Sequence, residues 1–123
     1  MIVLEAIKNA LNLGASQHAE ETLVEFLDQH PTNAKAHALL GTVYERAGDL
    51  ARSLPFLERA VELSPSDIHN HSALIFALDQ SPDVSLERAY QARRAFNALV
   101  RVASPKPNTN DRDPDRRLRV GYV

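Results

Sequence analysis

The sequence contains no cysteine, and only four of its 123 residues are glycine. Without cysteine the chain has no disulfide framework, no thiolate zinc site and no cysteine nucleophile. The four glycines are scattered, so they form no glycine-rich phosphate loop. Glu5 and Lys8 interrupt the apolar start before it is long enough for a signal peptide or a membrane span. We therefore expect a cytoplasmic protein without a membrane partner.

The charges nearly balance overall, with 14 basic and 16 acidic side chains and a net charge of −2. Residues 1–103 carry 9 basic and 13 acidic side chains, a net −4, whereas residues 104–123 carry 5 and 3, a net +2. The acidic body argues against nucleic acid as a partner, because such binding requires a basic face that displaces counterions. In the tail, three aspartates are interleaved with the arginines, which is typical of a solvated linker. These arginines are Arg112, Arg116, Arg117 and Arg119.

The chain repeats itself at a fixed offset. Pro31 falls on Pro65, an offset of 65 − 31 = 34 residues, and Leu23 falls on Leu57 at the same offset. Periods of this length are typical of stacked helical units, each too small to bury its own apolar face. A chain of this kind usually works by presenting a surface.

The central unit, residues 34–67, has small and apolar residues every three or four positions, as on one face of a helix. Gly48 is expected to end its first helix, and Asp49 to cap the second. The sequence thus predicts an all-α fold of six helices in three antiparallel pairs. The expected ranges are 2–13 with 17–29, 34–47 with 50–63, and 68–80 with 84–103, in repeats 1–33, 34–67 and 68–103.

The central unit resembles a tetratricopeptide repeat (TPR), a family whose helix pairs stack into a superhelix. The residues that carry the resemblance are Leu40, Gly41, Tyr44, Ser53, Leu57, Ala60 and Pro65. His37 stands where the family often has tryptophan, so the usual packing of an indole between helices is not expected. Pro55 lies inside the fourth expected helix and predicts a modest kink. Pro82 interrupts the third repeat where the turn glycine belongs, and the last helix drifts out of register.

After Ser104 the helical periodicity stops. Residues 104–117 include Pro105 and Pro107 and have no repeating apolar pattern, which predicts a linker. Residues 118–123 alternate between side-chain types and favour a single β-strand. A lone strand cannot satisfy its own edges, so we expect it to open a further α/β domain.

The segments 71–78, 110–114 and 117–123 resemble a junction in bacterial relatives of the O-linked N-acetylglucosamine transferases (SPINDLY-like proteins). There a TPR array leads into a two-lobed glycosyltransferase domain, whose first strand is similar to the Arg-Leu-Arg-Val-Gly-Tyr-Val of residues 117–123. The resemblance implies a chain that recruits protein substrates for sugar transfer. It also implies that the chain itself transfers nothing, because the family's catalytic residues lie downstream of that strand.

No group of side chains has the spacing of a catalytic or metal site. His69 and His71 lie on different sides of a helix, which makes them a poor metal pair. His37 and His71 occupy equivalent repeat positions, where packing at the seam of a helix pair is favoured over ligation. Glu58 and Glu62 share one helix face, as solvated surface carboxylates do. We expect no catalytic residues, no metal and no cofactor.

The resemblance to TPR proteins implies that a protein or peptide binds the concave face, which the first helix of each pair lines. Mapped onto this sequence, that face comprises Lys8, Asn12, Lys35, Thr42, Glu45, Arg46, Ser72, Phe76 and Gln80. The basic members suit a peptide carboxylate or acidic side chains. A polar solvent face without a ligand is the competing interpretation.

Two functions therefore remain open. One is the substrate-recruiting part of a protein O-glycosyltransferase, which the expected strand at 118–123 favours; the other is a stand-alone TPR adaptor with no link to sugar transfer. A third hypothesis is self-association through the last helix, where Leu99, Val100 and Val102 have little to cover them.

Overall fold

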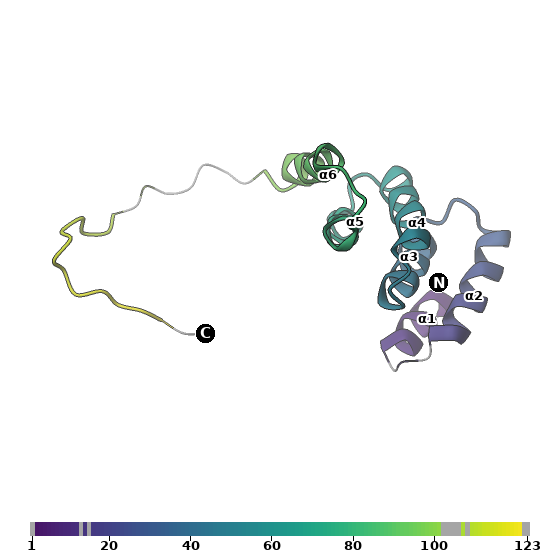
Figure 1. Cartoon of the computed structure of the whole chain (residues 1–123). Helices are drawn as coiled ribbons and strands as arrows, with labels where there is room; N and C mark the ends of the chain where they lie inside the picture. Colours follow the sequence, from purple (N-terminus) through teal and green to yellow (C-terminus); the bar gives the residue numbers. More distant parts are fainter. Residues whose placement is uncertain (1, 13, 15, 102–106, 108, 122–123) are drawn as a thin grey trace.

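The computed structural model describes residues 2–12, 14, 16–101, 107 and 109–121, and these form six helices (Figure 1). The first pair is α1 (Ile2–Asn12) with α2 (Ser16–Gln29), the second is α3 (Ala34–Arg46) with α4 (Leu50–Leu63), and the third is α5 (Ile68–Gln80) with α6 (Leu86–Leu99). The predicted all-α fold of three helix pairs is confirmed.

The pairs stack in the order of the chain. Helix α2 packs on α3 and α4 packs on α5, so each pair touches the next through its second helix (Figure 1). The first helices also meet, because α3 contacts both α1 and α5. One face of the stack is therefore built by α1, α3 and α5.

Each of the last four helices begins at a side chain that caps it. The side-chain oxygens of Asn33, Asp49, Asp67 and Ser85 accept backbone N–H bonds of 2.9–3.2 Å from the first turns of α3, α4, α5 and α6. These caps satisfy donors that have no partner within the helix. Gly48 adopts a φ of +78°, a left-handed conformation that ends α3 and turns the chain into α4.

The apolar core has two parts. The first lies between the first and second pairs, and its most buried members are Leu4, Leu23, Ala36 and Leu40. The second lies between the second and third pairs and comprises Leu54, Leu57, Leu74, Ala77 and Leu78. Because each part joins neighbouring pairs, no pair has a core of its own, as the repeat pattern predicts.

The second pair contains the tightest helix contact. A Cβ built on Gly41 of α3 would lie 2.6 Å from Leu57 Cδ2 and 3.3 Å from the Leu57 backbone nitrogen of α4. Next to this contact, the buried Ser53 Oγ donates a 2.7 Å hydrogen bond to the Gly41 carbonyl. Only glycine at position 41 allows the two helices to approach this closely.

The last helix differs from its expected range of 84–103. Ser85 caps it, so α6 begins at Leu86, and it ends at Leu99. Residues 102 and 103 lie outside the described part of the chain. The turn before α6 has five residues, 81–85, whereas the turn before α4 has three, 47–49. These two extra residues are the physical cause of the predicted loss of register.

Pro55 lies in the second turn of α4, and the helix continues through it from Leu50 to Leu63. Proline has no N–H, so the Ala51 carbonyl one turn earlier lacks its helical donor. The side chain is exposed, so the ring does not displace the core. The expected kink stays a prediction.

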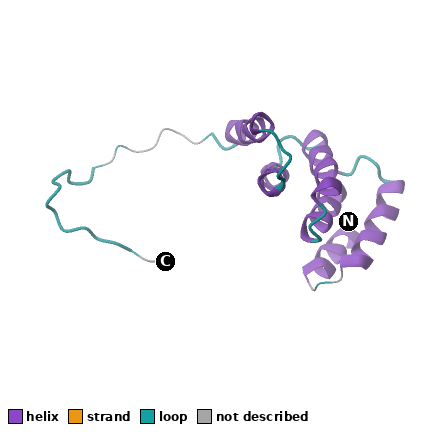
Figure 2. Ribbon diagram, viewed as in Figure 1, coloured by secondary structure: helices purple, strands orange, loops and turns teal. Residues whose placement is uncertain are grey.

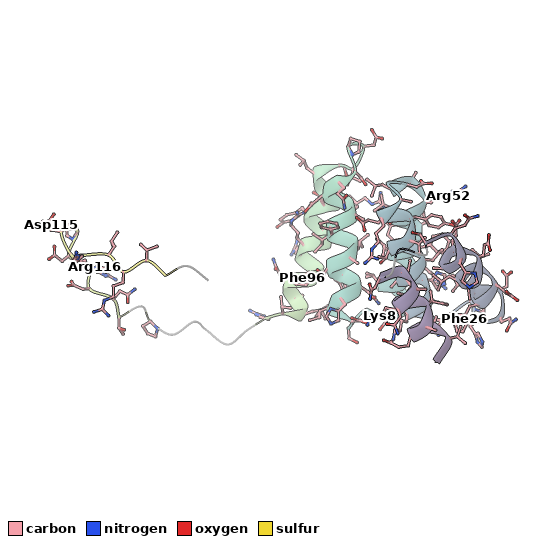
Figure 3. All side chains as sticks on the ribbon, turned by 90° about the horizontal axis from the view of Figure 1, so that it is seen from below. Lys8, Phe26, Arg52, Phe96, Asp115 and Arg116 are labelled. Carbon is pink, nitrogen blue, oxygen red and sulfur yellow. The ribbon has the colours of Figure 1, made fainter. Side chains whose placement is uncertain are left out.

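The strand expected at residues 118–123 is absent from the described part of that segment. Residues 118–121, its described part, have no strand structure (Figure 2), and Tyr122 and Val123 lie outside the described residues. A strand requires a neighbour to pair with, and residues 109–121 lie apart from the helices. Within this segment the Asp113 carbonyl accepts a 3.3 Å bond from the Arg116 N–H, which forms a turn. Figure 3 shows Asp115 and Arg116 on this turn, away from the repeats.

The contact at Gly41 predicts an unusual response to alanine. Although alanine normally favours a helix, we expect Gly41→Ala to lower the free energy of unfolding by about 1–3 kcal/mol, because the new methyl group overlaps Leu57. Urea denaturation measures the change. In the double variant Gly41→Ala/Leu57→Ala the overlap is gone, so its loss of stability should be smaller than the sum of the two single losses. Additive losses would contradict the steric explanation.

Replacement of Pro55 should have the opposite effect. Pro55→Ala restores the N–H that the Ala51 carbonyl lacks, and we expect it to raise the free energy of unfolding by about 1–2 kcal/mol. Thermal denaturation followed by circular dichroism measures the gain. Ala51→Gly, at another exposed position of the same helix, should lower stability instead. No gain in Pro55→Ala would show that the helix already compensates for the missing bond.

Candidate functional site

The face built by α1, α3 and α5 is hollowed by two adjoining pockets. The larger, of about 530 Å³, is lined by Lys8, Lys35, Ala38, Leu39, Thr42, Asp67, His69, Asn70 and Ala73. The smaller, of about 350 Å³, is lined by Thr42, Glu45, Leu57, His69, Ser72, Ala73 and Phe76. The two share Thr42, His69 and Ala73, so they form one continuous depression. We call it the inner groove.

The repeat explains why these residues converge. Lys8, Thr42 and Phe76 are separated by 34 residues each, so they occupy the same position on α1, α3 and α5. Leu39 and Ala73 form a second row with the same spacing. Since equivalent positions of stacked repeats point to the same side, these rows run across the face formed by successive pairs.

The α1 end of the inner groove is basic. Lys8 Nζ lies 3.9 Å from Glu5 Oε1, and Lys35 Nζ lies 3.7 Å from Glu5 Oε2. One carboxylate therefore faces two ammonium groups, and all three side chains are more than half exposed. Figure 3 shows Lys8 on the side of α1 that faces α5. Asp67 lines the same pocket, so the lining carries two ammonium groups and one carboxylate that solvent and ligands can reach.

The opposite end is acidic and apolar. Glu45 Oε1 accepts a 3.0 Å hydrogen bond from Gln80 Nε2, which connects α3 to α5. Phe76 lies beside this pair with 59% of its surface exposed, a large fraction for an aromatic side chain. The groove thus changes from basic to acidic along its length.

Six of the nine residues expected on the concave face line the inner groove, and Gln80 adjoins it through Glu45. The other two do not line it. Arg46 Nη1 donates a 3.2 Å hydrogen bond to the Leu11 carbonyl, which satisfies the C-terminal end of α1. Asn12 is exposed at the same end of α1. Arg46 therefore belongs to the contact between α1 and α3, and neither residue lines the groove.

Several lining residues were missed at the sequence level: Ala38, Leu39, Asp67, His69, Asn70 and Ala73. The 34-residue offset was a usable signal for two of them, because His69 is equivalent to Lys35, and Ala38 to Ser72. Leu39 and Ala73 are apolar and so did not look like binding residues. Asn70 is buried by tertiary contacts, where its Nδ2 donates to the Ala60 carbonyl.

The histidines at the pair seams have structural roles. His37 Nε2 lies 2.9 Å from the Pro31 carbonyl, and His71 Nε2 lies 2.8 Å from the Pro65 carbonyl. A carbonyl only accepts, so each Nε2 carries the proton and donates it. The His37 ring also lies 5.9 Å from the Phe56 ring, where the family often places an indole. Both imidazoles fasten a first helix to the proline turn that precedes it.

Tyr44 connects the first two pairs through a polar contact at the edge of the core. Its hydroxyl donates a 3.0 Å hydrogen bond to Glu20 Oε1, and Arg52 lies over its ring. Burial, followed by the hydrogen bond to Glu20, raises the pKa of the Tyr44 hydroxyl above its ordinary value of 10. This hydroxyl stays protonated at neutral pH and donates to the carboxylate.

Among the described residues, no group of three or more histidines, aspartates and glutamates is arranged to hold a metal ion. Within the same part of the chain, no helix combines the length and apolar character needed to cross a membrane.

Solved structures share this fold. The structure described as "MamA RS-1 ArsTM double mutant" aligns with a TM-score of 0.73 and 23% identity over 80% of this chain and 55% of that one. "MamA MSR-1 C2" aligns with a TM-score of 0.68 and 21% identity over 81% and 56%. The chain therefore spans just over half the length of these relatives, and at this identity the likeness shows the fold alone. No curated protein sequence matches the chain significantly.

The family model for the tetratricopeptide repeat matches residues 4–68. This segment is more than half of the chain and contains most of α1, all of α2 to α4 and the residues that carry the sequence resemblance. The chain therefore belongs to the tetratricopeptide repeat family.

Proposed function

We propose that the inner groove binds an extended peptide segment of a partner protein. As a TPR protein, the chain has the fold of a protein-interaction scaffold. The observation that carries the proposal is the inner groove itself, whose lining residues come from α1, α3, α4 and α5 and are held by the stacking of the pairs. Rigid placement of this kind lowers the entropic cost of binding a flexible ligand.

The lining of the groove suits a peptide with alternating side chains. Leu39, Ala73 and Phe76 offer apolar surface along the floor, while Thr42 and Ser72 add hydroxyl groups beside them. An extended peptide presents its side chains to alternate sides, so apolar groups can face the floor while the backbone bonds to the hydroxyls.

The charges give the bound peptide a direction. Lys8 and Lys35 present two ammonium groups to the larger pocket, whose lining contains one carboxylate, Asp67, so an acidic side chain or a terminal carboxylate fits the α1 end. Glu45, at the other end, suits a basic side chain. The ligand class is therefore an extended peptide whose acidic end lies on α1 and whose basic end lies near the junction of α3 and α5.

We further propose that this scaffold is the substrate-recruiting part of a protein O-glycosyltransferase. The support is the similarity of residues 110–114 and 117–123 to the junction before the catalytic domain in bacterial relatives of the O-linked N-acetylglucosamine transferases. The competing function, a stand-alone adaptor, uses the same groove. The two functions differ only in whether a catalytic domain is joined to the repeats.

Charge reversal at the basic end tests the peptide proposal. Peptides selected from a random displayed library on the purified chain serve as probes, and fluorescence anisotropy measures their Kd. We expect acidic residues to be enriched at one end of the selected peptides. Lys8→Glu/Lys35→Glu should weaken their binding by roughly tenfold or more, because two attractive charges become repulsive. Arg59→Glu/Arg101→Glu, an equal change of net charge at exposed positions on α4 and just after α6, should leave the Kd within about twofold.

A second variant tests the position of the groove. Thr42 lines both pockets, so Thr42→Arg fills the space where they join, and it should abolish binding of the selected peptides. Ala51→Arg, on an exposed position of α4, is the matched control and should bind as the parent does. Selected peptides that bind Thr42→Arg and the parent equally would place the site elsewhere and contradict the proposal.

The link to sugar transfer has a separate test. Sequencing of the gene beyond the Val123 codon should reveal a reading frame that continues into a two-lobed glycosyltransferase domain. A stop codon at that point would contradict the recruiting role and leave peptide binding by the groove unaffected.

A further inference from the structure

The first helix pair carries an apolar groove between α1 and α2. It has a volume of about 350 Å³ and is lined by Val3, Ala6, Ile7, Ala10, His18, Ala19 and Thr22. We call it the end groove. Val3 is 47% exposed, and Ala6 is also exposed. The end groove does not overlap the inner groove.

The same surface exists one repeat later, where it is covered. Addition of 34 to the end-groove positions gives His37, Leu40, Gly41, Tyr44, Arg52, Ser53 and Phe56. There α2 packs on α3, and Leu40 is only 1% exposed, whereas its equivalent Ala6 is open to solvent. The structure thus shows what this kind of surface binds: the second helix of a neighbouring pair.

The contacts of α2 show how such a helix is held. Its fifth residue, Glu20, accepts a hydrogen bond from Tyr44 and lies 3.9 Å from Arg52. The fifth residue of α4 is Leu54, which packs against α5 in the core between the second and third pairs. The fifth position of a second helix therefore faces the pair that comes after it.

At the other end of the stack, α6 presents this position to solvent. Its fifth residue is Tyr90, which is 57% exposed. Arg94, one turn later on the same face, is exposed as well. Leu86 and Leu99 add 90% and 40% exposed apolar side chains at the two ends of the helix. Figure 1 shows α6 at one end of the stack and the α1–α2 pair at the other.

We propose that the chain associates with a second copy of itself head to tail, with α6 of one copy lying in the end groove of the next. In this position α6 continues the established α2–α3 interface by one further repeat. Because the end groove and α6 are different surfaces, each copy in a dimer still has one of the two unoccupied. Further copies can bind there, so the contact generates open chains or closed rings rather than only dimers.

Charge and size complementarity both favour α6 as the occupant. Helix α2 carries four acidic residues and no basic one, a net −4, while α6 carries Glu87 and three arginines, a net +2. The exposed Glu21 and Glu25 lie within one turn of the groove residues His18 and Thr22, so this side of α2 is acidic. In the second repeat, the large Tyr44 of the receiving surface contacts the smaller Glu20 of α2. The residue equivalent to Tyr44 in the end groove is the small Ala10, which leaves room for Tyr90, the larger residue at the fifth position of α6.

A complementation experiment tests the head-to-tail geometry. The weight-average mass of the 123-residue chain in sedimentation equilibrium should rise above 13.7 kDa with concentration. Ala6→Arg places a charge in the end groove, and Tyr90→Glu places one on α6, so each variant alone should stay monomeric. An equimolar mixture should form a one-to-one dimer of twice the chain mass, because it contains one intact groove and one intact α6. Ala51→Arg is the control and should associate as the parent does.

Each other outcome overturns the proposal. These outcomes are a parent chain that is monomeric up to millimolar concentration, variants that associate like the parent, and a mixture that remains monomeric. A dimer of Tyr90→Glu alone would indicate a symmetric contact through the end groove and would also contradict head-to-tail association. If Ala6→Arg loses its helical circular dichroism signal, Val3→Arg, at a half-exposed position of the same groove, replaces it.

Discussion

The close approach of α3 and α4 at Gly41 is the constraint on which the rest of the structure depends. The absence of a side chain at this position lets Leu57 enter the interface, and the Ser53 hydroxyl fixes the two backbones by its bond to the Gly41 carbonyl. Leu57 belongs to the second core and also lines the inner groove. The packing inside the central pair thus determines both the position of α5 and the depth of the inner groove. One methyl group added at Gly41 would shift both.

A single repeat geometry produces two different surfaces. The first helices, α1, α3 and α5, place equivalent residues in rows and so create the inner groove. The second helices α2 and α4 each pack on the next pair along the chain. The end groove on α1–α2 therefore has no second helix packed on it, and the exposed face of α6 has no following pair to pack on. These end surfaces are a consequence of stacking, because every pair both covers a neighbour and needs to be covered. The proposed peptide site and the proposed self-association site are therefore independent.

Surface ion pairs also connect successive second helices. Arg52, the third residue of α4, pairs with Glu20 of α2, and Arg88, the third residue of α6, pairs with Glu58 of α4. Exposed pairs of this kind contribute little to stability individually, on the order of 0–1 kcal/mol. The carboxylate partners differ in position, because Glu20 is the fifth residue of α2 and Glu58 the ninth residue of α4, so the two pairs lie one turn apart along their helices. Arg93 adds a pair within the third repeat, where both carboxylate oxygens of Asp79 accept from it at 2.5–2.6 Å, and so attaches the displaced α6 to α5.

The sequence by itself determined the number, order and pairing of the helices, because the spacing of apolar residues, the cap at Asp49 and the left-handed Gly48 are local properties. It also placed Lys8, Thr42 and Phe76 on one face, since the 34-residue period relates them directly. Only the tertiary structure decided how these positions are used. It assigned Arg46 to the end of α1, brought Leu39 and Ala73 into the groove, and left Ala6 open while covering its equivalent Leu40. The reason is that each of these outcomes depends on which helix lies across from a residue, and the residue's own segment does not contain that information.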